Sequence, residues 1–438
     1  MKPRSIRKLL MREIEKVSES VEEFCLNPGT DFTRNRKIPV DKLMLSIIGM
    51  ESGNLTNELL DCYDVSPDTP TASAFVQQRL KLKPEAFETV FHGFSQKINK
   101  TNHYEIPIFA VDGSDIPISA DSKDDASFFQ GTNGQKPYGL LHLNALYDLN
   151  HRIYVDAVLQ KRRDFDEHAA LVSMVDKSSV KKAIIIADRG YEAYNNMAHI
   201  QEKGWSFLIR IKDGKTGIKD GFSLPTDDLF DVDIHLKLTR RQTKEVKKLM
   251  NDRNHYRVIP ANTRFDYLPK INHKHDPVLF YDMHFRMVRF QISDGIYETI
   301  VTNLNRNEFP PSELKRLYSY RWGIETSFRD LKYTVGLLDF HSKKVACIQQ
   351  EIYARLIMYN FAEMITSQVS IRKKPRKHVY KANFSVAVHM CRLYYREKVT
   401  LPVLETIIAK NLVPIRPNRH RERNLSSSGY HSFLYRVA

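Results

Sequence analysis

The chain has 438 residues, 42% of them hydrophobic and 27% charged, a composition typical of an ordinary globular protein. Its apolar runs are too short to cross a bilayer, and its four scattered cysteines argue against a zinc site or a disulfide framework and fit a reducing cytoplasm. Lys and Arg outnumber Asp and Glu by 67 to 52, and the net charge of +15 indicates a polyanionic partner, most simply nucleic acid.

Residues 1–103 are predicted to form a helical N-terminal region. Helical periodicity and cap signals place helices at residues 6–26, 40–50, 69–82 and 84–98. Local basic clusters, such as Arg34, Arg36 and Lys37, lie between and on these helices. Two interpretations stay open for this region, a helical cap on the domain that follows and a DNA-binding module.

From residue 104 the pattern changes to short apolar strands that alternate with helices. Strands are predicted at residues 106–111, 140–147, 152–159, 182–187, 205–211 and 297–304, and helices at 166–175 and 192–202. Residues 213–295 interrupt this order with charged segments and short strand-like runs. The pattern therefore predicts an α/β domain over residues 104–340 that carries a β-rich insertion.

The remaining residues, 341–438, are predicted to form a basic, helical C-terminal region with helices at residues 345–367 and 385–396. From residue 361 to the end there are 15 Lys and Arg against four Glu, a net charge of +11. Interleaved aromatic residues (Tyr380, Tyr394 and Tyr395) suit a surface that binds a nucleic-acid backbone. The alternative is that the basic tail only keeps the protein in solution.

A single helix is predicted to start at Pro310, Pro311 and Ser312 and to carry two stripes of side chains. The apolar stripe consists of Leu314, Leu317, Ile324, Phe328, Leu331 and Val335. The second stripe, about 100° around the helix, consists of Tyr318, Arg321, Glu325 and Lys332. It is either a solvated face with an Arg321–Glu325 ion pair, or a metal-binding carboxylate flanked by groups that hold phosphate oxygens.

Asp112 and Asp188 are each predicted to follow a short strand of the buried type. In an open α/β sheet, functional groups collect at the carboxyl ends of the strands. If the two strands are parallel neighbours, the carboxylates lie a few ångströms apart and need a cation between them. With Glu325 they form a set of hard oxygen ligands that suits two Mg²⁺ ions, or Mn²⁺ in their place, for displacement at a phosphodiester. For each aspartate alone, the alternative is a turn-forming residue.

The spacing Tyr318-x2-Arg321-x3-Glu325-x6-Lys332 resembles the Y-R-E-K signature of bacterial insertion-sequence transposases of the Asp-Asp-Glu class. Asp112 in Val-Asp-Gly-Ser and Asp188 in Ala-Asp-Arg-Gly resemble the two aspartates of that family, and the β-rich insertion resembles that branch. The resemblance covers about residues 104–340. It implies a ribonuclease H-like mixed sheet with flanking helices, in which the three acids are catalytic and hold two Mg²⁺ ions.

The resemblance also implies a set of DNA contacts. Tyr318 and Arg321 would hold backbone phosphates near the cleaved end, and Lys332 would hold a phosphate nearby. Arg210 and Lys212, in Phe-Leu-Ile-Arg-Ile-Lys, resemble a further DNA contact. For Arg189 two roles stay open, a phosphate contact and a partner for Asp188.

One feature departs from the family pattern. Some relatives stack a flipped base on a Trp within the β-rich insertion, whereas the two tryptophans of this chain, Trp205 and Trp322, lie outside it. Trp322 is interpreted as core packing beside the helix that carries Glu325, rather than as a platform for a base.

The function implied by the resemblance is that of a DNA transposase. A metal-activated water would cleave a strand at each transposon end, and the freed 3′-OH would attack target DNA. The expected partners are double-stranded DNA, both inverted-repeat ends and target, and a second copy of the chain in a synaptic complex, in the cytoplasm on the nucleoid and without a membrane. The alternatives are a metal-dependent nuclease of the same fold without strand transfer, and a non-catalytic, domesticated DNA-binding protein.

Overall fold

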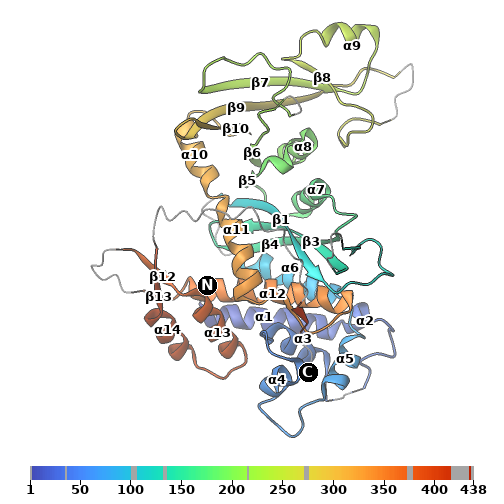
Figure 1. The fold of residues 1–438 in the computed structure, drawn as a ribbon, viewed down its shortest axis with the longest axis vertical. Helices are drawn as coiled ribbons and strands as arrows, with labels where there is room; N and C mark the ends of the chain where they lie inside the picture. The colour runs from blue at the N-terminus through green and yellow to red at the C-terminus, as the bar shows by residue number, and fades with distance from the viewer. Residues whose placement is uncertain are drawn as a thin grey trace.

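The computed structural model describes residues 2–34, 37–99, 106–131, 136–214, 217–270, 276–371 and 378–415, and the backbone of residues 434–435. The molecule is elongated, with helices from both ends of the chain at the foot of Figure 1, a sheet above them and the 213–295 segment at the top. Most of the basic residues counted after residue 361 lie outside the described residues. Among the described helices, none is both long and apolar enough to span a bilayer.

The centre of the fold is a mixed sheet. Its strands are β1 (Ile108–Ile118), β3 (Tyr138–Asp148), β4 (Ile153–Lys161), β5 (Ile184–Ala187) and β6 (Ser206–Arg210). β3 pairs antiparallel with both β1 and β4, whereas β1, β5 and β6 run parallel. This order, β4-β3-β1-β5-β6 with helices on both faces, is the ribonuclease H-like mixed sheet that was expected, and it is confirmed.

The 213–295 segment extends this sheet rather than forming a separate one. It contains β7 (Phe230–Thr239), α9 (Lys244–Leu249), β8 (Tyr256–Val258) and β9 (Tyr281–Ser293). β9 pairs with β10 (Ile296–Thr302), and β10 pairs with β6, so that one ten-stranded sheet results. Neither β7 nor α9 is predicted from the sequence, because the frequent charged residues of this segment mask the alternation of buried Ile234, Leu236 and Leu238.

Helices from both ends of the chain cover one face of the sheet. The N-terminal ones are α1 (Pro3–Glu19), α2 (Val21–Phe24), α3 (Val40–Gly49), α4 (Leu55–Cys62), α5 (Ala72–Arg79) and α6 (Glu85–Asn99). The C-terminal ones are α12 (Val345–Thr366), α13 (Phe384–Tyr395) and α14 (Leu401–Lys410). Their apolar side chains form one continuous core with residues of β1, β3 and β4. The division into regions 1–103, 104–340 and 341–438 stays a prediction.

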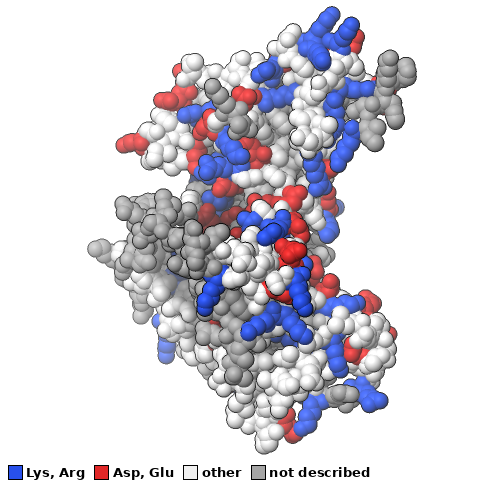
Figure 2. All heavy atoms as spheres, turned by 45° about the vertical axis from the view of Figure 1, so that its right-hand side comes forward, with Lys and Arg blue, Asp and Glu red and all other residues white. Residues whose placement is uncertain are grey.

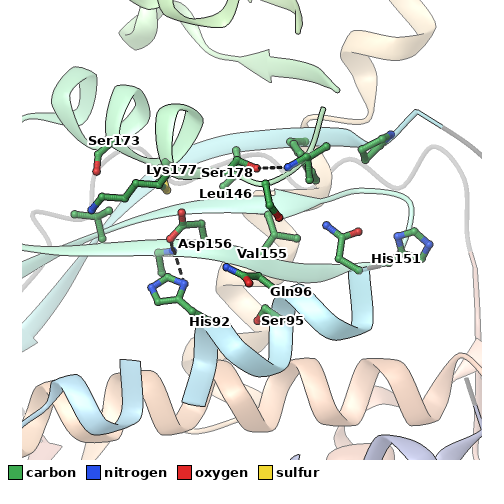
Figure 3. A pocket seen from close by; sticks show the side chains of 18 of the residues that line it. His92, Ser95, Gln96, Leu146, His151, Val155, Asp156, Ser173, Lys177 and Ser178 are labelled. Atoms are coloured by element: carbon green, nitrogen blue, oxygen red, sulfur yellow. Dashed lines mark hydrogen bonds and ion pairs between the residues drawn. The ribbon is translucent and has the colours of Figure 1, made fainter. Parts of the chain in front are cut away.

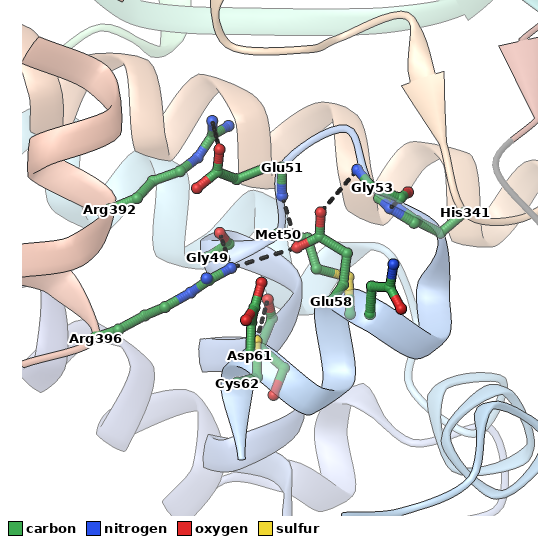
Figure 4. Close-up of polar contacts among 12 residues, drawn as sticks. Gly49, Met50, Glu51, Gly53, Glu58, Asp61, Cys62, His341, Arg392 and Arg396 are labelled. Atoms are coloured by element: carbon green, nitrogen blue, oxygen red, sulfur yellow. Dashed lines mark hydrogen bonds and ion pairs between the residues drawn. The ribbon is translucent and has the colours of Figure 1, made fainter. Parts of the chain in front are cut away.

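Buried polar contacts hold these helices together. The carboxylate of Glu58 on α4 accepts hydrogen bonds from the backbone N–H groups of Glu51 and Gly53, both at 2.9 Å. Arg396, which follows α13, donates to the Gly49 carbonyl at 2.6 Å and contacts Glu58 at 3.4 Å (Figure 4). The loop between α3 and α4 is therefore held by Glu58, which follows it in the sequence, and by Arg396 from near the other end of the chain.

A second contact of this kind joins α5 to α12. Arg79 and Glu351 are both 1% exposed, and Arg79 Nη1 lies 2.7 Å from Glu351 Oε1. Arg79 Nε also donates to Gln350 Oε1 at 2.7 Å, and the His341 N–H donates to Glu351 Oε2 at 3.1 Å. Burial by itself raises the pKa of Glu351, but Arg79 and His341 outweigh it and lower the pKa to about 2. Glu351 is therefore ionised in the core and depends on Arg79.

We expect Arg79→Met to lower the free energy of unfolding by about 3–5 kcal/mol, because it leaves the buried Glu351 carboxylate without its partner. Chemical denaturation monitored by circular dichroism measures this loss. The control is Lys37→Met, which removes an exposed, solvent-screened ion pair with Asp68 and should leave the free energy of unfolding nearly unchanged. Equal losses for the two variants would contradict the assigned role of the pair.

Candidate active site

The two aspartates lie side by side on neighbouring strands. β1 and β5 are parallel, as expected, and their last paired residues are Val111 and Ala187. Asp112 follows Val111 in β1, and Asp188 follows Ala187, the last residue of β5. Their backbones are therefore adjacent. The expectation that β1 ends before Asp112 is wrong, because β1 remains paired with β3 as far as Ile118. Asp112 thus lies within a continuous strand, where pairing on one side holds it rigidly.

Arg210 lies on the neighbouring strand β6, level with Asp188. β5 pairs in parallel with β6, Ala187 opposite Ile209, so Arg210 lies beside Asp188. Its Nη2 and Nε lie 2.7 and 3.0 Å from Asp188 Oδ1, and its Nη1 lies 2.9 Å from Glu298 Oε1. Arg210, which is predicted to contact DNA, therefore neutralises the charge of Asp188 in this structure.

The helix predicted from residue 310 onwards is broken into three parts. They are α10 (Pro311–Ser319), α11 (Trp322–Arg329) and a π-helix over Asp330–Thr334. At the first break the backbone N–H groups of Arg321, Gly323 and Ile324 donate to residues three positions earlier, at 2.8–3.1 Å. The prediction of one regular helix is wrong here, because apolar periodicity does not distinguish a tightened turn from a regular one.

Both stripes of this segment are largely buried. The apolar stripe is confirmed, since Leu314, Leu317, Ile324, Phe328, Leu331 and Val335 are all in the core. In the second stripe, Arg321 is 4% and Tyr318 6% exposed, so the interpretation as a solvated face is wrong. The interpretation of Trp322 as core packing is also wrong, because this residue is 52% exposed.

The side chains of the second stripe are turned towards the sheet. Arg321 Nη2 lies 2.8 Å from Glu325 Oε1, the i,i+4 ion pair expected from the sequence. Lys332 Nζ donates to the Asp115 carbonyl on β1 at 3.0 Å, and burial lowers the pKa of this lysine. The phenol oxygen of Tyr318 is buried and has no hydrogen-bond partner among the described residues.

Two other predicted DNA contacts are exposed at the edge of this site. The side chains of Arg189, just after Asp188, and of Lys212, just after β6, both face solvent. The backbone N–H of Arg189 donates to Asp188 Oδ1, whereas the ion-pair partner of that carboxylate is Arg210. Of the two roles open for Arg189, exposure favours the phosphate contact.

Asp112 is in an environment that disfavours its charge. Burial raises its pKa to about 6, and the charges of Glu325 and Glu167 add to the rise. The Gly113 N–H and the charge of Arg321 act in the opposite direction. Asp112 is therefore coupled electrostatically to Glu325, and Glu167, on another helix, belongs to the same group.

Glu167 and its neighbours carry little signal in the sequence. Glu167 is one acidic residue in the first turn of α7 (Glu167–Lys177), and His142 is one polar residue in the apolar strand β3. In the structure His142 lies between Asp115 Oδ1, 2.6 Å from its Nδ1, and Glu167 Oε1, 3.0 Å from its Nε2. Only strand register, which places His142 opposite Asp115, brings these residues together.

Two of the predicted acids are paired with arginines in this structure. Within the described part of the chain, no group of three or more His, Cys, Asp and Glu residues is arranged to hold an ion. The geometry gives the reason, because Arg210 and Arg321 bind Asp188 and Glu325. Guanidinium groups thus supply the positive charge that two of the acids need.

A cavity of about 1030 Å³ lies elsewhere in the molecule (Figure 3). It is lined by α6, β4 and α7 and by residues just before β1 and β5, such as Pro107 and Lys182. It therefore lies at the amino ends of the two parallel strands, whereas the acids lie towards their carboxyl ends. His92 and Asp156, 3.6 Å apart, face one another across part of it.

Comparisons with known proteins agree with this geometry. A family model described as a transposase DDE domain matches residues 103–361, which include Asp112, Asp188 and Glu325. The transposase InsG for insertion sequence element IS4 of Escherichia coli (strain K12) is 21% identical over 361 residues, 78% of this chain and 73% of that protein. A cryo-EM structure of a piggyBac transposase synaptic complex with hairpin DNA aligns with a TM-score of 0.45 and 11% identity, covering 95% of this chain and 86% of that one.

The family match spans more than half of the chain and contains the row of acids across β1 and β5 as well as α11. The mixed sheet and the positions of these residues fit the chemistry of that domain. The chain therefore belongs to the family of DDE transposases, and it is an insertion-sequence DNA transposase.

Proposed function

We propose that Asp112, Asp188 and Glu325 together bind two Mg²⁺ ions, which Mn²⁺ can replace, and that the protein uses them to move its own DNA element. It cleaves a strand at each inverted-repeat end and joins the freed 3′-OH to target DNA. The observation that supports this most strongly is the adjacency of Asp112 and Asp188 on parallel strands, with Glu325 on a helix packed against β1.

The donor set fits divalent ions. Enzymes of this family use divalent metal ions, and oxygen donors select hard cations such as Mg²⁺. Asp112 is buried beside other carboxylates, so its ionised form is disfavoured and added positive charge would stabilise it. When bound, the ions would supply Lewis-acid activation of the attacking oxygen and stabilisation of the leaving oxygen.

The arginines have two tasks in this proposal. Without ions, Arg210 and Arg321 neutralise Asp188 and Glu325. Once ions take over the carboxylates, both guanidinium groups become available to phosphate oxygens, which they bind in a bidentate manner. Binding of metal and binding of DNA should therefore favour each other.

The remaining contacts follow the same chemistry. Lys332 and Tyr318 would hold phosphates near the cleaved end, the lysine as a point charge and the phenol as a hydrogen-bond donor. Lys212 and Arg189, both exposed, would bind the backbone at the rim of the site. The Y-R-E-K set is thus proposed as a phosphate clamp around Glu325.

More distant basic side chains suit the rest of the DNA. Figure 2 shows Lys and Arg over the 213–295 segment at the top and over the lower half of this face, with acidic residues between them. Exposed members on that segment include Lys237, Lys244, Lys247, Lys248 and Arg253. A transposase holds two ends at once, so we propose a homodimer in the synaptic complex, acting on the nucleoid in the cytoplasm.

We expect Asp112→Asn, Asp188→Asn and Glu325→Gln each to reduce strand cleavage by about 1000-fold or more, because each removes a charge that holds the ions. End-labelled inverted-repeat DNA with Mg²⁺ and a plasmid target measures cleavage and joining in one assay. The matched control, Asp252→Asn in an exposed turn, should cleave normally. Normal cleavage by Glu325→Gln would refute the assignment, and cleavage by wild type without joined product would indicate a nuclease.

We expect Asp112→Asn to stabilise the metal-free protein at neutral pH. The pKa of about 6 in the folded state exceeds the ordinary value near 4, so folding stability is lost as pH rises through about 6. In EDTA at pH 7.5 the variant should be more stable by about 3 kcal/mol, at about 1.4 kcal/mol per tenfold change in proton affinity.

Thermal unfolding at several pH values checks this expectation. The difference between variant and wild type should shrink as pH is lowered from 7.5 towards 4, where wild-type Asp112 is protonated in the folded protein. A difference that does not change with pH would show that Asp112 carries no such penalty.

A further inference from the structure

Glu167 lies close to both of the segments that carry the predicted catalytic aspartates. A Cβ atom added at Gly113, directly after Asp112, would lie 2.5 Å from Glu167 Oε1. A Cβ atom added at Gly190, two residues after Asp188, would lie 3.9 Å from Glu167 Oε2. The carboxylate therefore occupies the space between the two segments, and glycine at position 113 is required to make room for it.

A network behind Glu167 fixes this position. His142, whose side chain is 6% exposed, contacts Glu167 Oε1 at 3.0 Å and Asp115 Oδ1 at 2.6 Å. Arg162 lies 2.8 Å from the same oxygen of Asp115 and stacks on Phe165, which packs against the imidazole. Burial by itself lowers the pKa of His142, but its hydrogen bonds to the two acids outweigh that effect and raise it.

His142 holds one oxygen of the Glu167 carboxylate. The ion pair between the two side chains uses Oε1, whereas Oε2 is the oxygen that faces Gly190. Glu167 is also one of the charges that raise the pKa of Asp112, as is Glu325. The carboxylate is therefore close to the predicted metal ligands while one of its oxygens remains directed towards the segment after Asp188.

A separate observation points to a missing ligand at the same place. Tyr191 is 2% exposed, and its phenol oxygen has no hydrogen-bond partner among the described residues. The charges that act on this phenol are those of Glu167, Asp112 and Asp188. A buried hydroxyl without a partner is costly, and an ion with bound water would satisfy it.

We propose that Glu167 is a fourth carboxylate of the metal site and holds one of the divalent ions together with Asp112 and Asp188. This inference rests on the proposed function, since it places Glu167 at the same pair of ions. It assigns His142 as a positioning residue, because the imidazole fixes Oε1 and thereby the orientation of the carboxylate. It also gives a reason for glycine at position 113, where a side chain would collide with His142 and Glu167.

The test measures Mn²⁺ binding by isothermal titration calorimetry on the full-length protein without DNA. We expect Glu167→Gln, which keeps the size and the hydrogen-bonding capacity of the side chain, to weaken Mn²⁺ binding by about 10- to 100-fold. The matched control is Asp166→Asn, one residue away, whose side chain caps α7 by accepting from the Ala169 N–H at 2.9 Å. The control should bind Mn²⁺ as wild type does.

Asp112→Asn separates the two proposals. If Asp112→Asn weakens Mn²⁺ binding and Glu167→Gln binds as tightly as Asp166→Asn, the role of Glu167 is refuted and the proposed function stands. If Asp112→Asn binds Mn²⁺ like wild type, the proposed metal site itself is wrong. Circular dichroism establishes that each variant is folded. Should Glu167→Gln not fold, Glu167→Asp replaces it, and unchanged binding by that shortened acid would also overturn the inference.

Discussion

The site depends on the negative charges that gather where the central strands β1 and β5 carry Asp112 and Asp188. Parallel pairing of β1 with β5 places Asp112 next to Asp188, and β6 places Arg210 beside them. α11 adds Glu325 together with Arg321, and α7 adds Glu167. Carboxylates this close repel one another unless cations lie among them. In the metal-free protein the arginines supply part of the positive charge, and the raised pKa of Asp112 reflects the repulsion and burial that remain.

This constraint explains why the site is built on rigid elements. Asp112 lies inside an eleven-residue strand that is paired along its length, and Arg321 and Tyr318 are buried beneath the surface. The helical ends of the chain pack against the same strands through one continuous core, which also includes Ile324 and Phe328 of α11, and through buried pairs such as Arg79–Glu351. The position of each acid is therefore fixed before any ion or DNA binds, which limits the reorganisation that catalysis requires.

Much of this fold follows from local sequence patterns, and the failures have identifiable physical causes. The β-branched run before Asp188 and the apolar stripe from Leu314 to Val335 are local signals, and the structure buries both. The break at Tyr320 and Arg321 was missed because a tightened turn preserves the apolar periodicity. The exposure of Trp322 was missed because residue type alone does not determine which side of a broken helix faces the core.

The candidate site likewise contains residues that the sequence predicts and residues that it does not. Asp112, Asp188 and Glu325 can be chosen from motifs, since each sits in a short recognisable stretch. Glu167 and His142 cannot, because they are defined by the register between β1 and β3 and by the space left at Gly113. Arg210 is predicted from the sequence to contact DNA, but its bond to Asp188 follows from the pairing of β5 with β6, which no local pattern reveals.

The most direct measurement of the central claim is a crystal structure of the protein soaked with Mn²⁺, in which anomalous scattering locates the ions. The account predicts two peaks bridged by the carboxylates of Asp112, Asp188 and Glu325, with Arg210 and Arg321 displaced from their present partners. Peaks elsewhere, or no peaks while both arginines keep their carboxylate contacts at saturating Mn²⁺, would contradict it.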